Sequence, residues 1–337
     1  MPVSLQSIRR REGLKGWIKR RMFVFLRKQS LELYGYRGKR MAVYANDYIG
    51  HQINLFGIYE KEELEALARF LQPVAAELKT STCLDIGANI GNHSVFFAGL
   101  FGRVHSFEPN PSNFRLLQFN AGYHDNIVPH DLALGEESGG FYMREYVDNF
   151  GRSEIVDDPA EGDVLIAVKT LDQFDLGEER VAFIKIDVEG MEPKVLRGAE
   201  QTIARHQPII AMEQHRDDFR GGGSASVAWL TERGYRFCWY EGRPKTSKLA
   251  KGLYDLREAF LGVEDRIVYG DEVPVRFHNM LIAVPPRYQQ VLGLIGRLLR
   301  QAEAGRGGAR PQSGTGSSPM ILSTVSGKSR TRTPQAL

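Results

Sequence analysis

The first segment that could do chemistry is a glycine turn between an apolar strand and a helix. The run Cys83-Leu84-Asp85-Ile86-Gly87-Ala88-Asn89-Ile90-Gly91 leads directly into a helix that Asn92 or Ser94 can cap. Gly87 permits a positive φ angle and lets a ligand approach the backbone, and Gly91 allows close contact between helix and strand. Turns at the carboxyl ends of parallel strands are where α/β sheets bind nucleotide-like ligands.

The glycine spacing and two nearby acids narrow the class of ligand. Gly-x-x-x-Gly differs from the Gly-x-Gly-x-x-Gly turn that binds pyrophosphate. Asp85 could accept a hydrogen bond from an amino group or hold an ordered water. Glu108 lies 21 residues after Gly87, close to the spacing at which an acid reaches a ribose diol, and Pro109 stops its strand. Together these residues predict a nucleoside-type cofactor with a cationic amino acid end.

A second group of ionisable residues begins inside a later strand. Lys185 interrupts an otherwise apolar run, and Asp187 and Glu189 follow it. Burying these charges without partners is costly, so they are expected to pair with each other, with a ligand or with a metal. The alternative is a structural Lys–carboxylate pair that only fixes the turn.

The next strand ends in Glu213 and His215. In a parallel sheet these two residues would join Asp187 and Glu189 at the edge that carries the glycine turn. There the four side chains could supply a general base for a hydroxyl nucleophile. Asp187 and Glu213 could also bind a hard divalent cation such as Mg²⁺ through oxygen ligands.

The elements that position these groups follow from the hydrophobic pattern. Short apolar runs alternate with helical patterns, which predicts a mostly parallel sheet covered on both faces. Two further strands near 141–147 and 163–168 are expected, with a mobile loop at 148–162. The expected core strands are 81–86, 103–107, 127–132, 181–187, 208–213, 235–240 and 280–284, and the expected helices are 61–78, 92–100, 111–123, 193–205 and 225–233.

Composition excludes several other classes of protein. The chain has 337 residues, a formal net charge of +3 and 42% hydrophobic residues, which is ordinary for a globular protein. Two cysteines exclude a disulfide scaffold and a Cys-rich zinc module. The sequence has neither an apolar run long enough to span a membrane nor an adequate signal-peptide core. These features predict a cytoplasmic protein.

The two ends of the chain differ from the middle. The basic arm 1–45 carries Trp17, Ile18, Met22, Phe25 and Leu26 at helical spacings, so it could lie as an amphipathic helix on the inner, anionic membrane surface. A solvated helix or a partly disordered arm is the alternative. An amphipathic helix is expected at 287–300, docked on the domain, and a disordered tail at 301–337, which is rich in Gly, Ser, Thr, Arg and Pro.

With these motifs placed, the chain resembles the FkbM-type family of S-adenosylmethionine-dependent methyltransferases. The resemblance covers the domain at 46–286. It rests mainly on Asp85-Ile86-Gly87-Ala88-Asn89-Ile90-Gly91 and Lys185-Ile186-Asp187-Val188-Glu189-Gly190. Supporting matches are Gly57-Ile58-Tyr59-Glu60, Phe107-Glu108-Pro109, Thr170-Leu171-Asp172 and Asn279-Met280-Leu281-Ile282-Ala283-Val284-Pro285.

The family implies a class I methyltransferase fold, a Rossmann-like three-layer α/β sandwich. Its seven-stranded sheet is mostly parallel, with one antiparallel strand. The resemblance also implies S-adenosylmethionine as cofactor, with the methionine part at the glycine turn, the ribose at Glu108 and the adenine beside Asp131-Leu132-Ala133. The cofactor-binding residues are therefore expected to be Asp85, Gly87, Ala88, Asn89, Gly91, Asn92, Glu108, Pro109, Asp131 and Leu132.

The expected reaction is methylation of a hydroxyl group on a small molecule, a glycan or a glycolipid. Glu189, Glu213 or His215 would act as the base, and Asp187 would orient the substrate or a cation. A nicotinamide-dependent oxidoreductase on a similar sheet is one alternative, and a non-catalytic nucleoside-binding module is another. Specific methylation of nucleic acid is disfavoured, because Asp187-Val188-Glu189-Gly190 stands where an Asn- or Asp-Pro-Pro-Tyr turn would be.

Overall fold

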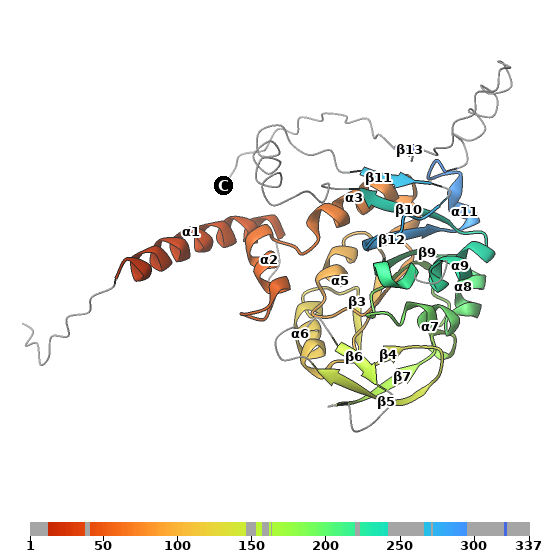
Figure 1. Ribbon diagram of the computed structural model, residues 1–337, viewed down its shortest axis with the longest axis horizontal. Helices are drawn as coiled ribbons and strands as arrows, with labels where there is room; N and C mark the ends of the chain where they lie inside the picture. The colour runs from red at the N-terminus through yellow and green to blue at the C-terminus, as the bar shows by residue number, and fades with distance from the viewer. Residues whose placement is uncertain are drawn as a thin grey trace, which may run out of the picture.

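The computed structural model describes residues 13–37, 41–145, 153–156, 162, 164–219, 223–241, 266–270, 272–294 and 320–321. Within them, the main body is a large twisted sheet with helices on both faces (Figure 1). The basic helix at the N-terminus stands apart from this body. A smaller second sheet lies along the lower edge of the main body in this view (Figure 1).

The central sheet confirms the expected topology and extends it. Its strand order among the described residues is β13-β11-β10-β12-β9-β8-β1-β2-β3. From β3 to β9 neighbouring strands are parallel, whereas β12 is antiparallel to both β9 and β10. The bounds are β1 Thr82–Ile86, β2 Arg103–Phe107, β3 Ile127–His130, β8 Val181–Ile186, β9 Ile209–Gln214, β10 Arg236–Glu241, β11 Arg266–Tyr269, β12 His278–Val284 and β13 Met320–Ile321.

The seven strands from β3 to β10 are the predicted class I sheet, six parallel and one antiparallel. The prediction omitted β11, which pairs antiparallel with β10 at the sheet edge. It is only four residues long and follows a polar stretch, so its alternation is too short to stand out.

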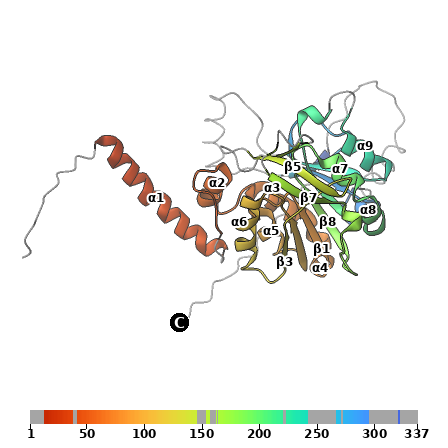
Figure 2. The same cartoon turned by 90° about the horizontal axis from the view of Figure 1, so that it is seen from below.

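Both faces of the sheet are buried, as a three-layer sandwich requires. Side chains alternate between faces along a strand. Thus Cys83 packs in one core cluster with residues of α3 and α5, while Leu84 packs in the other with residues of α7, α8 and α9. Figure 2 shows these helices on opposite sides of the sheet. Their bounds are α3 Lys61–Leu71, α5 Asn92–Phe97, α7 Glu192–Arg197, α8 Glu200–His206 and α9 Ala225–Glu232.

Two expected helices are interrupted in the structure. The 61–78 segment forms α3, a 3₁₀ turn at Gln72–Val74 and α4 at Ala75–Leu78, because Pro73 lacks the amide proton that a continuous helix uses. The 193–205 segment divides at Gly198 into α7 and α8. The expected 111–123 helix is α6, Pro111–Ala121, which is capped by the Asn110 side chain.

The insertion before β8 is a separate four-stranded sheet rather than a strand pair. Its order is β4-β7-β5-β6. The segment 148–162 was expected to be a mobile loop, and where it is described residues 153–156 instead form β6, paired antiparallel with β5. The bounds are β4 Ala133–Leu134, β5 Gly139–Glu145, β6 Ser153–Val156 and β7 Val164–Lys169.

The basic arm contains α1, Leu14–Arg37, followed by α2, Tyr48–Phe56. The segment predicted as an amphipathic helix at 287–300 docks on the domain through Tyr288, Leu292 and Leu294, which are buried in the first core cluster. The helix there, α11, covers only Pro286–Gln289, and residues 295–300 lie outside the described part. The tail predicted to be disordered also lies outside it, except for Met320–Ile321, which pair with β11.

The two glycines of the first turn are needed because a side chain at either position would collide with a neighbouring segment. Gly87 has φ 76°, and a Cβ there would lie 1.8 Å from the carbonyl oxygen of Asp187 at the end of β8. Gly91 was expected to let the helix approach the strand, but a Cβ there would instead meet Leu117 of α6. The turn after β1 therefore sits tightly between the end of β8 and α6.

We predict that Gly87→Ala destabilises the protein much more than Gly190→Ala. Both glycines have positive φ, which costs an alanine about 1 kcal/mol. Only Gly87 has backbone atoms in the way, whereas nothing lies within 4 Å of a Cβ at Gly190. Chemical unfolding should show a loss of about 3 kcal/mol or more for Gly87→Ala and about 1 kcal/mol for Gly190→Ala. Equal losses would contradict the packing argument.

Candidate functional site

A cavity of about 470 Å³ opens at the carboxyl ends of the central strands. This is within the size range of small-molecule sites. The glycine turn after β1, the end of β2, the turn after β8 and the end of β9 all contribute to its walls. The start of α2 and the segment before α3 close another side.

Lys185 is the cation at the floor of this cavity. The side chain is 8% exposed, and its Nζ lies 3.4 Å from Asp85 and 3.2 Å from Asp187. It also donates a hydrogen bond to the Gly87 carbonyl oxygen. Burial by itself would lower the pKa of Lys185, but Asp187 and Asp85 hold that pKa above its ordinary value. The lysine therefore stays charged and ties β8 to the glycine turn.

Asp85 supports this floor from below. It is fully buried, its Oδ2 accepts a 2.6 Å hydrogen bond from Ser94 Oγ, and Ser106 Oγ donates in turn to Ser94 Oγ. Its Oδ1 lacks a hydrogen-bond partner and faces only the Lys185 charge. Asp85 is not part of the cavity lining, so it acts on the cavity through Lys185 rather than at its surface.

Glu108 lies in the neighbouring wall of the cavity, directly after β2. One carboxylate oxygen accepts from the backbone N–H of Asn89 at 2.8 Å, and the other accepts from that of Asn110 at 2.9 Å. Burial raises the pKa of Glu108 to about 7, against the opposing effect of these hydrogen bonds. The carboxylate lines the cavity and retains lone pairs for hydroxyl donors.

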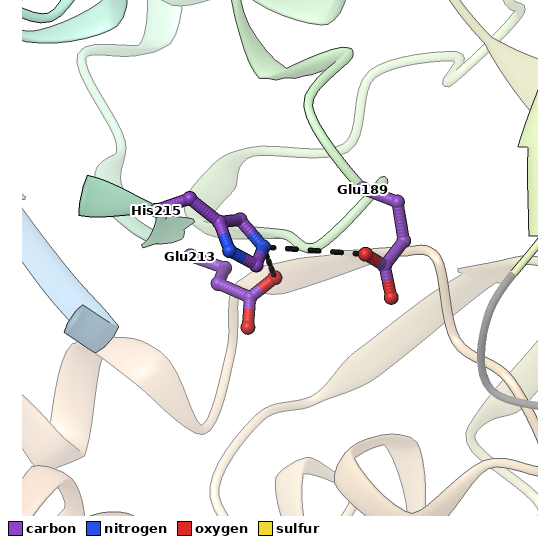
Figure 3. Close-up of side chains that lie close together, drawn as sticks. All are labelled: Glu189, Glu213 and His215. Atoms are coloured by element: carbon purple, nitrogen blue, oxygen red, sulfur yellow. Dashed lines mark hydrogen bonds and ion pairs between the residues drawn. The ribbon is translucent and has the colours of Figure 1, made fainter. Parts of the chain in front are cut away.

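A third cluster, the acidic edge, consists of Glu189, Glu213 and His215 (Figure 3). His215 Nε2 lies 3.1 Å from Glu213 Oε2 and 4.0 Å from Glu189 Oε2. Burial raises the pKa of Glu213 to about 9, and the charges of Asp187 and Glu189 add to the shift. At neutral pH this carboxyl is therefore protonated. A positive charge placed nearby would favour loss of that proton.

Within the described chain, the acidic edge also brings potential metal ligands together. The ligand atoms of Glu189, Glu213 and His215 all lie within 4.8 Å of one another. The expected metal ligand Asp187 is not in this set and instead forms an ion pair with Lys185. Glu213 and His215 already lie within hydrogen-bond distance of each other, so neither side chain needs a cation as its partner.

A fourth group, which the sequence did not predict, comes from the segment before α3 and from α5. Glu60 and His93 both line the cavity, with Glu60 Oε2 3.1 Å from His93 Nε2. The Asn92 side chain fixes this segment by accepting from the Tyr59 N–H and donating to the Tyr59 carbonyl. Burial and Glu60 raise the pKa of Tyr59, so its hydroxyl stays protonated.

Backbone strain is concentrated around the cavity. Four non-glycine residues in the described chain have positive φ, namely Glu60, Asn89, Glu189 and Gln207, and the first three line the cavity. Such conformations cost of order 1–3 kcal/mol each and persist where the surroundings impose them. Their location favours this cavity as the candidate functional site within the described part of the chain.

Most of the predicted site residues meet here. Asp187, Glu189 and Glu213 line the cavity, while His215 stands behind Glu213. Asp131 and Leu132 lie outside the lining, and the following Ala133 and Leu134 take that place. Of the expected cofactor-binding residues, those in the lining are Gly87, Ala88, Asn89, Asn92, Glu108 and Pro109.

Other lining residues were not predicted. Asp47 and Tyr48 come from the start of α2, and Met143 comes from the inserted sheet. No local chemistry in the sequence marks them, because only tertiary contact brings them to the sheet edge. Glu60 did carry a signal, since Tyr59-Glu60 belongs to a segment singled out by resemblance.

Comparison with known proteins agrees with the geometry. Residues 85–237 match the family described as the Methyltransferase FkbM domain. A curated relative, Methyltransferase 1 of Beauveria bassiana (strain ARSEF 2860), is 28% identical over 147 residues. That match covers 36% of this chain and 59% of the relative, so the chain spans about three fifths of its length.

Solved structures of methyltransferases are also similar. The FkbM methyltransferase from Methylobacillus flagellatus KT is 21% identical, with 59% of this chain and 56% of that chain covered and a TM-score of 0.36. The magnesium protoporphyrin IX methyltransferase from Synechocystis PCC 6803 is 9% identical, with 79% and 96% covered and a TM-score of 0.37. The sequence match and the strand order agree: residues 85–237 of this chain match the FkbM family of methyltransferases, and the sheet has the order expected from that resemblance.

Proposed function

We propose that the protein is an S-adenosylmethionine-dependent methyltransferase that methylates a hydroxyl oxygen. The acceptor class we favour is a sugar or glycan, a glycolipid or a secondary metabolite. Support comes from the FkbM domain and from a cavity whose walls combine the glycine turn with Glu108. Glu108 is suited to a ribose diol, because its buried carboxylate accepts hydrogen bonds.

The observation that carries the proposal is the excess of carboxylates around the cavity. Burial and the charges of Asp187, Glu189, Glu192 and Glu60 raise the pKa of Glu213 to about 9. A site that resists one further negative charge favours a cationic ligand. S-adenosylmethionine fits this requirement, since it carries a sulfonium and an ammonium group.

The chemistry that the cofactor supplies is an activated methyl group on a positive sulfur. The protein must then align an acceptor and take up one proton. Cofactor charge favours ionisation of Glu213, which can then accept the hydroxyl proton directly or through His215 at 3.1 Å. Asp187, which is paired with Lys185 and lines the cavity, would orient the acceptor hydroxyl.

The alternatives fit the cavity less well. A nicotinamide dinucleotide would bring two phosphates toward Asp187, Glu189 and Glu213, and the glycine turn lacks the pyrophosphate spacing. A non-catalytic nucleoside-binding module would not need the Glu213–His215 pair or the strained Glu189.

Calorimetry tests the cofactor directly. The purified protein should release or absorb heat with S-adenosylmethionine and S-adenosylhomocysteine but not with NAD. Incubation with S-adenosylmethionine and glycan or lipid extracts should then yield a product that is heavier by one methylene in mass spectra. Binding of NAD alone would overturn the proposal.

We predict that Glu213→Gln and Asp187→Asn abolish most turnover while S-adenosylhomocysteine still binds. Loss of a general base typically costs about 10²–10⁴-fold in rate. The dissociation constant for the neutral thioether should change by less than about threefold, because Glu108 and the glycine turn remain intact.

The matched controls are Glu178→Gln and Asp125→Asn, which remove exposed carboxylates away from the cavity. Both should keep wild-type turnover. If Glu213→Gln and Asp187→Asn remained fully active, the acidic edge would have only a structural role.

We predict that the preference for S-adenosylmethionine over S-adenosylhomocysteine grows with pH. The pKa of Glu213 is raised to about 9, so at neutral pH a sulfonium must displace its proton. The affinity ratio should rise by up to about tenfold per pH unit below pH 9 and level off above it. The two ligands share every other charge, so titration calorimetry from pH 6.5 to 8.5 isolates the sulfonium. An affinity ratio that does not change with pH would contradict this coupling. So would a Glu213→Gln protein whose affinity ratio rises with pH as steeply as that of the wild type.

We also predict that removal of divalent cations with EDTA leaves turnover unchanged. Glu213 and His215 lie within hydrogen-bond distance of each other, and Asp187 is paired with Lys185. A loss of turnover restored by Mg²⁺ would instead assign the acidic edge to a metal.

A further inference from the structure

The helix α1 presents large apolar side chains to solvent. The exposed fractions are 55% for Trp17, 65% for Phe23 and 62% for Phe25. Both perpendicular views show α1 extending away from the domain (Figures 1 and 2). Apolar exposure on this scale, concentrated in one element, is typical of an interaction surface. The other exposed apolar residues of α1 are Leu14, Ile18, Met22, Val24, Leu26 and Leu31.

The same helix is strongly cationic. Its only acid is Glu32, which lies 3.9 Å from Lys28 in a solvent-exposed ion pair. The Arg21 guanidinium lies over the Trp17 ring, 5.6 Å from its centre. The basic residues of α1 are Lys15, Lys19, Arg20, Arg21, Arg27, Lys28 and Arg37.

The spacing mixes apolar and basic side chains around the helix. At 100° per residue, Trp17, Ile18 and Phe25 fall on one broad half with Leu14, Met22, Val24 and Leu26, and Arg21 and Lys28 fall among them. Phe23 falls on the other half with Lys19 and Arg27, so apolar and basic side chains share both halves. The basic residues have long aliphatic stems that allow the charge to reach water while the stem lies along an apolar surface.

The apolar exposure continues onto α2, which contacts α1. Tyr48, Leu55 and Phe56 are 67%, 39% and 50% exposed. Tyr48 also lines the cavity. The exposed surface therefore runs from α1 to the rim of the candidate active site.

We propose that α1 docks in the plane of an anionic lipid membrane. Aromatic and aliphatic side chains would enter the acyl–headgroup boundary, and the lysines and arginines would contact anionic headgroups. The charge of the helix is complementary to such a surface. In the described chain no helix is both long and apolar enough to cross a bilayer, so α1 would lie on the membrane.

Co-sedimentation of the full chain with lipid vesicles tests this docking without cofactor or acceptor. Binding should be at least about tenfold tighter to vesicles with about a third phosphatidylglycerol than to pure phosphatidylcholine, and should weaken as salt increases. Since methyl transfer is not measured, failure here leaves the proposed function untouched, and the reverse also holds.

Two variants separate the contributions of charge and apolar contact. Lys15→Gln/Lys19→Gln/Arg27→Gln should weaken binding by about fivefold per side chain. Trp17→Ser/Phe25→Ser should weaken binding to anionic vesicles by at least about tenfold. The matched controls on α6, Arg115→Gln and Phe119→Ser, remove an exposed charge and an exposed aromatic ring from the domain and should bind as wild type.

Three results would overturn the proposal. One is equal binding to neutral and anionic vesicles, and another is wild-type binding by both α1 variants. The third is absence of vesicle binding by a protein that sediments as a dimer, with Trp17→Ser/Phe25→Ser restoring the monomer. That last result would assign the exposed side of α1 to a second copy of the chain.

Discussion

The charged floor of the cavity is the constraint on which the rest of the site depends. Lys185 is almost fully buried, and its charge is held between Asp85 and Asp187 while it also donates to the Gly87 carbonyl. Removing Lys185 or the fully buried Asp85 costs about 3–5 kcal/mol, because the remaining buried charge loses its partner. The ends of β1 and β8 are therefore locked together, and every wall residue is positioned relative to that lock.

Above this neutralised floor, the carboxylates are in excess. Asp187 is paired with Lys185, and Glu189 and Glu213 both lie within 4.0 Å of the His215 ring. Burial raises the pKa of Glu213, and this excess of negative charge raises it further. The strained backbone at Glu60 and Glu189 indicates that the fold holds these acids in place at a conformational cost. An excess of negative charge of this kind favours a ligand with positive charge.

The sequence predicted the elements whose pattern is local. The apolar runs of the parallel strands and the glycine turn are strong local signals, so the positions of the core strands and the gathering of Asp187 and Glu213 were predictable. Two kinds of feature were not. Short edge strands such as β6 and β11 have too few residues to show a period. Contacts such as Gly91 with Leu117, or Glu60 with His93, join segments whose pairing depends on tertiary packing.

The same electrostatics give the proposed reaction a direction. Under the proposed function, the donor enters with a sulfonium charge and leaves as a neutral thioether. The carboxylates around Glu213 stabilise the donor more than the product, and the proton taken from the acceptor restores the neutral carboxyl that burial favours. Each turnover then returns the acidic edge to its starting protonation state without an external cation. Product release and rebinding of donor are both favoured by one feature, the surplus of carboxylates over cations at this edge of the sheet.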